Sequence, residues 1–476
     1  MSPAPVPRAP SRRRTALSLT GAGVCGIALL AAGMAGAQDA PNPALTFSFG
    51  STFTANDNLD LDPVSAGTSS WIDNRFGLSY ATETATSALA FDASGVWRLS
   101  DIPGAGGGSD FDDQTAALSY SREGANSRLT LNGRINRSDI AFFDPLRLVD
   151  DPSTPIDEGD LTAGDDGSRR TTSASLRFET GIAGPLGFDI AASHYGRDYQ
   201  DTTDPDYYDT TRDTLSLGAT LRPNERLSLR LSLSQTDYSA KDAPQTERST
   251  RRASVGGSYA LDPATSLSFS VGKTWIDSEE GLGLGRVSSS EDGLNASLGL
   301  SRALANGSIG LSLSHDITVD GEAWTDLLLS RDMELPNGAL SVSLGPSFRE
   351  GETGVVGTLA FDRELPRGAF SLSASRKISS SDDSTRDTMR LGLGLSHALT
   401  PLSNLSLDID YLDTDSDRAG ADRSRSRLSL TYSHDLGQDW QLRGGYALTE
   451  SDREGEATAR SNSVFLTLQK AITFSP

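Results

Sequence analysis

The sequence contains one cysteine in 476 residues, and that cysteine, Cys25, lies in an apolar stretch near the start. The rest of the chain therefore has no thiol for a disulfide, a catalytic nucleophile or a thiolate metal site. After that stretch no run approaches the ~20 apolar residues that a membrane-spanning helix needs. The mean hydropathy is −0.34. These absences exclude a disulfide-stabilised domain and a helical membrane protein.

Positive charge is also scarce. Acidic residues outnumber lysine and arginine by 64 to 42, which gives a formal charge of −22. Four of the arginines and no acid lie in residues 1–37, so the remaining chain carries −26. A general nucleic-acid binder needs a basic face, and this balance excludes such a partner.

The N-terminus has the pattern of a secretory signal. Three arginines, Arg12 to Arg14, precede an apolar core, and Ala35-Gly36-Ala37 matches the small-residue cleavage pattern. We expect residues 1–37 to be a cleaved signal peptide, residues 38–44 a short periplasmic lead-in and residues 45–476 one β-barrel. In this division no plug domain precedes Leu45, which disfavours a siderophore-type transporter.

The abundant feature is alternation of apolar and polar residues. Residues 214–221 read TLSLGATL and residues 226–238 read RLSLRLSLSQTDY, with a polar turn between them. Leucines at every second position give one apolar and one polar face, so the unit is a β-hairpin. We count about 22 such runs, an even number as single-chain bacterial barrels require. A soluble sandwich, the alternative, would hide its apolar faces between two sheets.

The connections between these runs favour the barrel. Short turns alternate with longer, Asp-rich stretches, which include 55–68, 101–113, 201–210, 276–290 and 414–422. Short periplasmic turns and long external loops are typical of outer-membrane barrels. We therefore predict an all-β protein: a single large antiparallel up-and-down transmembrane β-barrel of the bacterial outer membrane. Its expected partners include lipid and lipopolysaccharide. The last strand ends on an aromatic residue, Phe474, and so resembles the signal read by the outer-membrane assembly machinery, which is a further expected partner.

Aromatic residues near strand ends predict interfacial girdles facing the lipid headgroups. The residues are Trp71, Tyr80, Trp97, Tyr120, Tyr238, Trp275, Phe348, Tyr411 and Trp440.

Catalytic and metal chemistry finds little support. Each of the four histidines follows a serine, as in Ser433-His434. Adjacent strand residues point to opposite faces, so each pair is split across the wall, whereas catalysis needs both groups within hydrogen-bond reach. Asp413, Asp415 and Asp417 have the spacing of a calcium loop but lack its turn glycine and late glutamate. We expect no enzyme, no metal and no cofactor.

The candidate site is a pore constriction. The third external loop, 141–168, is the longest and most acidic, and in general porins the third loop narrows the pore. Its carboxylates are Asp144, Asp150, Asp151, Asp157, Glu158, Asp160, Asp165 and Asp166. Strand phase places basic side chains in the lumen at Arg75, Arg98, Arg128, Arg134, Arg177 and Arg230. Acids opposite bases would tune which ions pass; alternatively the loop is an exposed acidic segment.

Residues 47–62, FSFGSTFTANDNLDLD, contain an Asp57-Asn58 dipeptide after the first strand. This opening resembles the β-barrel porin type 2 group, and the resemblance implies an outer-membrane barrel associated with exopolysaccharide and without catalytic residues. The expected function is a porin-like channel for passive diffusion of small hydrophilic solutes or ions. One alternative is the barrel of an exopolysaccharide or surface-polymer export system with periplasmic partners. The other is a barrel-borne hydrolase, which would need serine and histidine on one face.

Overall fold

The computed structural model describes residues 43–104, 106–142, 167–202, 207–282, 285–349, 352–381, 384–416 and 422–474. Every regular element in these ranges is a β-strand, and none of them contains a helix able to cross a membrane. The strands are β1 (Ala44–Asn56), β2 (Ser69–Glu83), β3 (Ser87–Ile102), β4 (Gly106–Glu123), β5 (Ser127–Asp139), β6 (Ser168–Thr180), β7 (Leu186–Gln200), β8 (Thr210–Asn224), β9 (Leu227–Ala240), β10 (Glu247–Ala260), β11 (Thr265–Leu282), β12 (Gly285–Leu304), β13 (Gly307–Ile317), β14 (Ala323–Leu335), β15 (Gly338–Arg349), β16 (Glu352–Leu365), β17 (Gly368–Ser381), β18 (Ser384–Thr400), β19 (Ser403–Ser416), β20 (Arg423–Gly437), β21 (Trp440–Arg453) and β22 (Ala459–Phe474).

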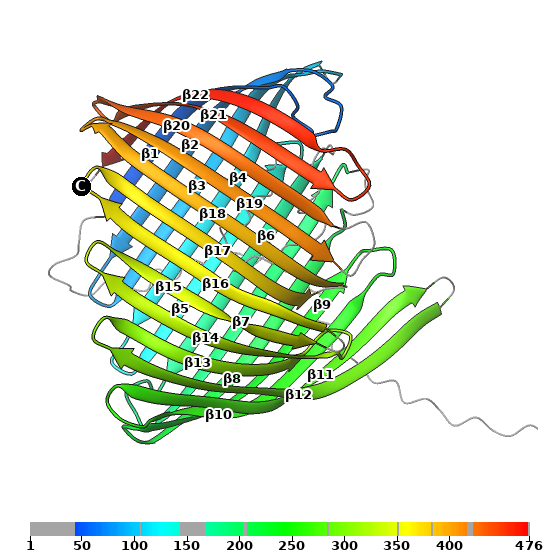
Figure 1. Ribbon diagram of the computed structural model, residues 1–476, viewed down its shortest axis with the longest axis vertical. Helices are drawn as coiled ribbons and strands as arrows, with labels where there is room; N and C mark the ends of the chain where they lie inside the picture. Colours follow the sequence, from blue (N-terminus) through cyan, green and yellow to red (C-terminus); the bar gives the residue numbers. More distant parts are fainter. Residues whose placement is uncertain are drawn as a thin grey trace, which may run out of the picture. The chain divides into compact units, whose positions relative to one another are not determined.

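The 22 strands form one closed antiparallel barrel. Each strand pairs with its neighbours in the sequence, and β1 pairs with β22 from Leu45↔Phe474 to Asn56↔Ser463. Closure leaves no sheet edge, which is the condition for a sheet to stand in lipid. The strands run obliquely around the wall in Figure 1. The predicted fold class and strand number are confirmed.

The outward face is apolar. On β8 and β9, Leu217 pairs with Leu233, and each is 45% exposed although both are large hydrophobic residues. The same face carries half-exposed Phe, Leu, Ile and Val on nearly every strand. An apolar outer belt is the surface that a membrane barrel presents to lipid.

The inward face is polar and made largely of small side chains. Ser216 pairs with Ser234, and cross-strand hydroxyl pairs recur, such as Ser232–Ser254 at 2.6 Å and Ser270–Ser297 at 2.8 Å. These pairs let serine hydroxyls hydrogen-bond to one another while the side chains stay short. A 22-stranded wall lined in this way encloses a lumen that side chains do not fill.

The two ends of the barrel differ. At the short-turn end, which joins β2 to β3 and each later even strand to its successor, connections have two to five residues. At the opposite end, the long-loop end, they reach 28 residues between β5 and β6. The predicted asymmetry is therefore present only in part, because β11–β12, β15–β16 and β17–β18 are each joined by two residues at this end.

The prediction of a long loop is wrong for two segments. Most of 101–113 and 276–290 is strand, because β3 with β4 and β11 with β12 continue as hairpins. The β11–β12 hairpin extends past the neighbouring strands (Figure 1), and residues 285–295 pair with β11 alone. A hairpin beyond the lipid belt needs no alternation of apolar residues, so the sequence pattern did not reveal it.

Strand register also corrects the predicted girdle. Seven of its nine aromatic residues lie on the outward face, but Trp71 and Tyr238 lie on the inward one. Trp71 pairs with Thr54, and Tyr238 with Arg248, both lumen-facing positions. These two aromatics belong to the lumen wall.

Candidate functional site

All six arginines predicted to face the lumen lie on the inward strand face. They are Arg75 on β2, Arg98 on β3, Arg128 and Arg134 on β5, Arg177 on β6 and Arg230 on β9. The carboxylates predicted to oppose them, Asp144 to Asp166, lie outside the described residues. The constriction itself therefore stays a prediction.

Three of these arginines form ion pairs toward the short-turn end. Arg128 contacts Glu123 at 2.7 Å, Arg177 contacts Glu179 at 3.1 Å, and Arg230 contacts Asp189 at 2.7 Å. The arginine side chains are 43–53% exposed, so water screens these pairs. They balance charge on the wall and add little rigidity.

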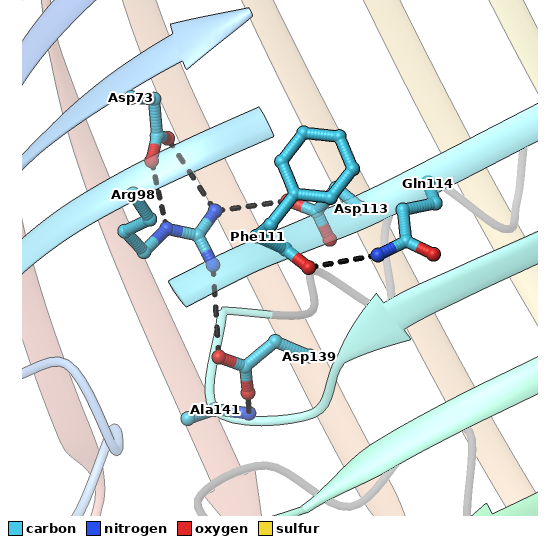
Figure 2. Close-up of polar contacts among 7 residues, drawn as sticks. All are labelled: Asp73, Arg98, Phe111, Asp113, Gln114, Asp139 and Ala141. Atoms are coloured by element: carbon cyan, nitrogen blue, oxygen red, sulfur yellow. Dashed lines mark hydrogen bonds and ion pairs between the residues drawn. The ribbon is translucent and has the colours of Figure 1, made fainter. Parts of the chain in front are cut away.

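Arg98 is different because it is buried and surrounded by acids from neighbouring strands (Figure 2). Its Nε lies 2.7 Å from Asp73 on β2, and its Nη2 lies 2.9 Å from Asp113 on β4. Its Nη1 lies 3.7 Å from Asp139 at the end of β5, close enough for an ion pair without a hydrogen bond. The Arg98 side chain is 6% exposed. One guanidinium therefore ties four consecutive strands together.

A bulge in β4 brings Asp113 to this position. The register between β3 and β4 shifts between Ser94 and Val96, and Asp113 has a φ of 49°. Aspartate tolerates this left-handed conformation better than most residues. The bulge leaves Asp113 without a partner on β3 in the ladder, and its carboxylate lies 2.9 Å from Arg98.

The same cluster holds the start of the longest connection inside the barrel. The guanidinium carbon of Arg98 lies 3.8 Å from the centre of the Phe142 ring, and that ring packs edge-on against Trp71 at 5.1 Å. The Asp139 carboxylate accepts a hydrogen bond from the backbone N–H of Ala141 at 3.0 Å. Because Trp71 and Arg98 face the lumen, the chain leaving β5 turns into the lumen rather than away from the rim.

Arginine and tyrosine line the next part of the wall, from β7 to β10. Tyr238 lies between two guanidinium groups, with Arg212 at 5.6 Å and Arg248 at 5.7 Å from its ring. Arg197 donates a hydrogen bond to the Tyr195 hydroxyl at 3.0 Å. These arginines were not among the predicted lumen residues, although each lies at an inward position of the alternating pattern on β7, β8 or β10.

The long-loop end has ion pairs between its connections. Lys241 Nζ donates to Asp209 at 2.9 Å, which joins the connection after β9 to that before β8. This hydrogen bond, with the charge of Asp209, raises the pKa of Lys241.

The adjacent Ser–His pairs are split across the wall, as predicted. Ser314 pairs with Ser297 on the inward face, while His315 pairs with Ala296 on the outward face. One non-adjacent pair does share a face, since Ser403 Oγ lies 2.9 Å from His434 Nδ1 at the short-turn end.

That contact has structural geometry. Ser403 is 7% exposed, and its Oγ also accepts hydrogen bonds from Thr400 and Tyr432. Across the described ranges no carboxylate hydrogen-bonds to His434. A nucleophile needs access to substrate and an oriented base, so the arrangement does not favour a hydrolase. Nor does the described part of the chain bring together three metal-ligating side chains.

Comparison with known proteins identifies the fold. No protein-family model and no curated protein matches the sequence. Among solved structures, the ferric-catecholate import receptor Fiu from E. coli K12 in its open form superposes with a TM-score of 0.58 at 10% identity, over 91% of this chain and 82% of that one. The FrpB iron transporter from Neisseria meningitidis gives 0.57 at 10% identity, over 91% and 82%. The alcaligin outer membrane receptor FauA from Bordetella pertussis gives 0.53 at 12% identity, over 89% and 76%. The chain thus has the fold of bacterial outer-membrane transport barrels, with the apolar belt that such a location requires.

Proposed function

We propose that this protein is a channel of the bacterial outer membrane through which small hydrophilic solutes or ions diffuse. The observation that carries the proposal is the inward face, where Ser, Thr, Gly and charged residues predominate around a barrel of 22 strands. A barrel of this size with short lumen side chains leaves an aqueous path unless a segment or partner fills it.

The proposal includes a constriction at the long-loop end. Phe142, the last residue described before 143–166, lies on the lumen side against Arg98 and Trp71. The carboxylates from Asp144 to Asp166 would then lie across the lumen from the inward arginines and set a field across the path. The support is the position of Phe142 and the charges of the two groups.

The test is the conductance of the refolded protein in a planar bilayer under a potassium chloride gradient. We expect stepwise open currents. Deletion of 150–166 should change both the conductance and the reversal potential, because it removes carboxylates from the path. A control is deletion of Pro63 and Val64, two exposed and uncharged residues in the connection after β1, which should leave both unchanged.

Correct insertion without current would overturn free diffusion. It would favour a barrel closed by its own segments or by a partner, as in polymer export or in import receptors such as Fiu. Polymer export rests on the resemblance of 47–62 to the β-barrel porin type 2 group, which no family match supports. The hypothesis of an import receptor rests on the shared fold alone, and one fold serves many functions.

A further inference from the structure

A concavity of about 570 Å³ opens on the lumen wall across β3 to β8. Its polar lining includes Asp92, Asn132, Arg134, Ser193, Tyr195 and Arg212. It thus combines one carboxylate, two guanidinium groups, an amide and hydroxyls within one hollow. Such convergent polar groups in a concave surface are the general mark of a ligand site.

Two of these residues are charged and form no ion pair or hydrogen bond in the described part of the chain. They are Asp92 and Arg134, and both are exposed. Arg212 differs, because it lies over the Tyr238 ring and has a further interaction. Most other lumen arginines that were predicted are paired, so the free pair in this hollow is distinctive.

The spacing of Asp92 and Arg134 is fixed by the sheet. Asp92 pairs with Ala117, and Ala117 pairs with Arg134, so the two residues share one rung with a single strand between them. Neighbouring strands lie about 4.8 Å apart, which puts the two backbones roughly 10 Å apart. No ion pair joins them within the described ranges. A solute with both charges could bridge them.

We propose that this concavity binds a small zwitterionic solute, with the carboxylate of the solute on Arg134 and its ammonium group on Asp92. The inference rests on the proposed diffusion channel. It names the class of solute that would bind to the wall on its way through the lumen. Ser119 on β4 and its partner Asn132 on β5 supply neutral donors and acceptors beside the two charges. A monovalent anion or cation would satisfy only one of them.

The probe is 4-aminobutanoate, and butanoate and butylammonium are the single-charge controls. In single-channel recordings of the full protein, 4-aminobutanoate should interrupt the current at concentrations at least about tenfold lower than either control. Asp92→Asn and Arg134→Gln should each raise its half-blocking concentration by about tenfold, because each removes one charged hydrogen bond. Arg443→Gln removes an exposed, inward-facing charge on β21, outside the concavity, and should shift that concentration less than about twofold.

Equal block by all three probes would overturn the inference, as would an equal effect of Arg443→Gln. Isothermal titration of 4-aminobutanoate into the detergent-folded protein separates this inference from the channel proposal. Binding that both variants abolish, in a protein that gives no current, supports the site and refutes diffusion. Currents without measurable binding or block refute the site and leave the channel.

Discussion

Loss of the Arg98 charge should destabilise the barrel far more than loss of a comparable lumen arginine. Arg98→Met keeps an unbranched apolar stem but leaves Asp73 and Asp113 without their cation. The Arg98 side chain is 6% exposed and these carboxylates are 23% and 27% exposed. Breaking a buried charge network from one side costs about 3–5 kcal/mol. The matched change Arg128→Met, at a side chain 48% exposed, should cost only about 0–1 kcal/mol.

The assay is equilibrium urea unfolding of both variants and the parent, folded in the same lipid vesicles. A third variant, Arg98→Met with Asp73→Asn and Asp113→Asn, should recover part of the lost stability because the carboxylates no longer lack a counter-charge. Equal unfolding free energies for Arg98→Met and Arg128→Met would refute the reasoning. So would a triple variant less stable than the single one.

Four further substitutions test the wall itself. The assays are unfolding in vesicles, conductance and, for the last substitution, electrophoresis. Leu298→Arg, in the outer belt, should cost about 2–4 kcal/mol, whereas the adjacent Ser297→Arg should cost little and lower conductance; equal costs would contradict the assigned faces. Gly345→Val should cost at least about 1–3 kcal/mol, because a Cβ would meet the carbonyl of Leu327; an unchanged unfolding midpoint would argue against that close approach. Phe474 packs on Phe47 where β22 closes on β1, so Phe474→Ala should lower the yield of folded barrel. The yield is measured as the band that shifts on heating in electrophoresis, and an unaltered yield would exclude a role for that ring.

The fold could be predicted because lipid imposes a strict pattern. Leu227 to Leu233 alternate with serine and arginine since one face meets lipid and the other the lumen, and the same constraint recurs on all 22 strands. The β11–β12 hairpin was missed where that constraint ends. Beyond the rim both faces meet water, so only backbone hydrogen bonds define the strands.

The site could be predicted only in part. The alternation of apolar and polar residues was enough to place Arg98 in the lumen. Its partners Asp73, Asp113 and Asp139 come from three other strands. The strand register decides which of these residues meet, and alternation does not determine the register. The β4 bulge at Asp113 adds a shift that alternation cannot reveal. Trp71 was assigned to the girdle because it stands at a strand end, yet its phase directs it inward, where it packs on Phe142.

The most direct test of an aqueous lumen is cysteine modification on β13, where neighbouring residues face opposite sides. The predicted mature chain has no cysteine, so Ser312→Cys and Leu313→Cys each provide a single thiol. A charged, membrane-impermeant methanethiosulfonate added during bilayer recording should lower the current of Ser312→Cys in steps and leave Leu313→Cys unchanged. Modification of Leu313→Cys alone, or equal effects on both, would contradict a water-filled lumen behind an apolar outer wall.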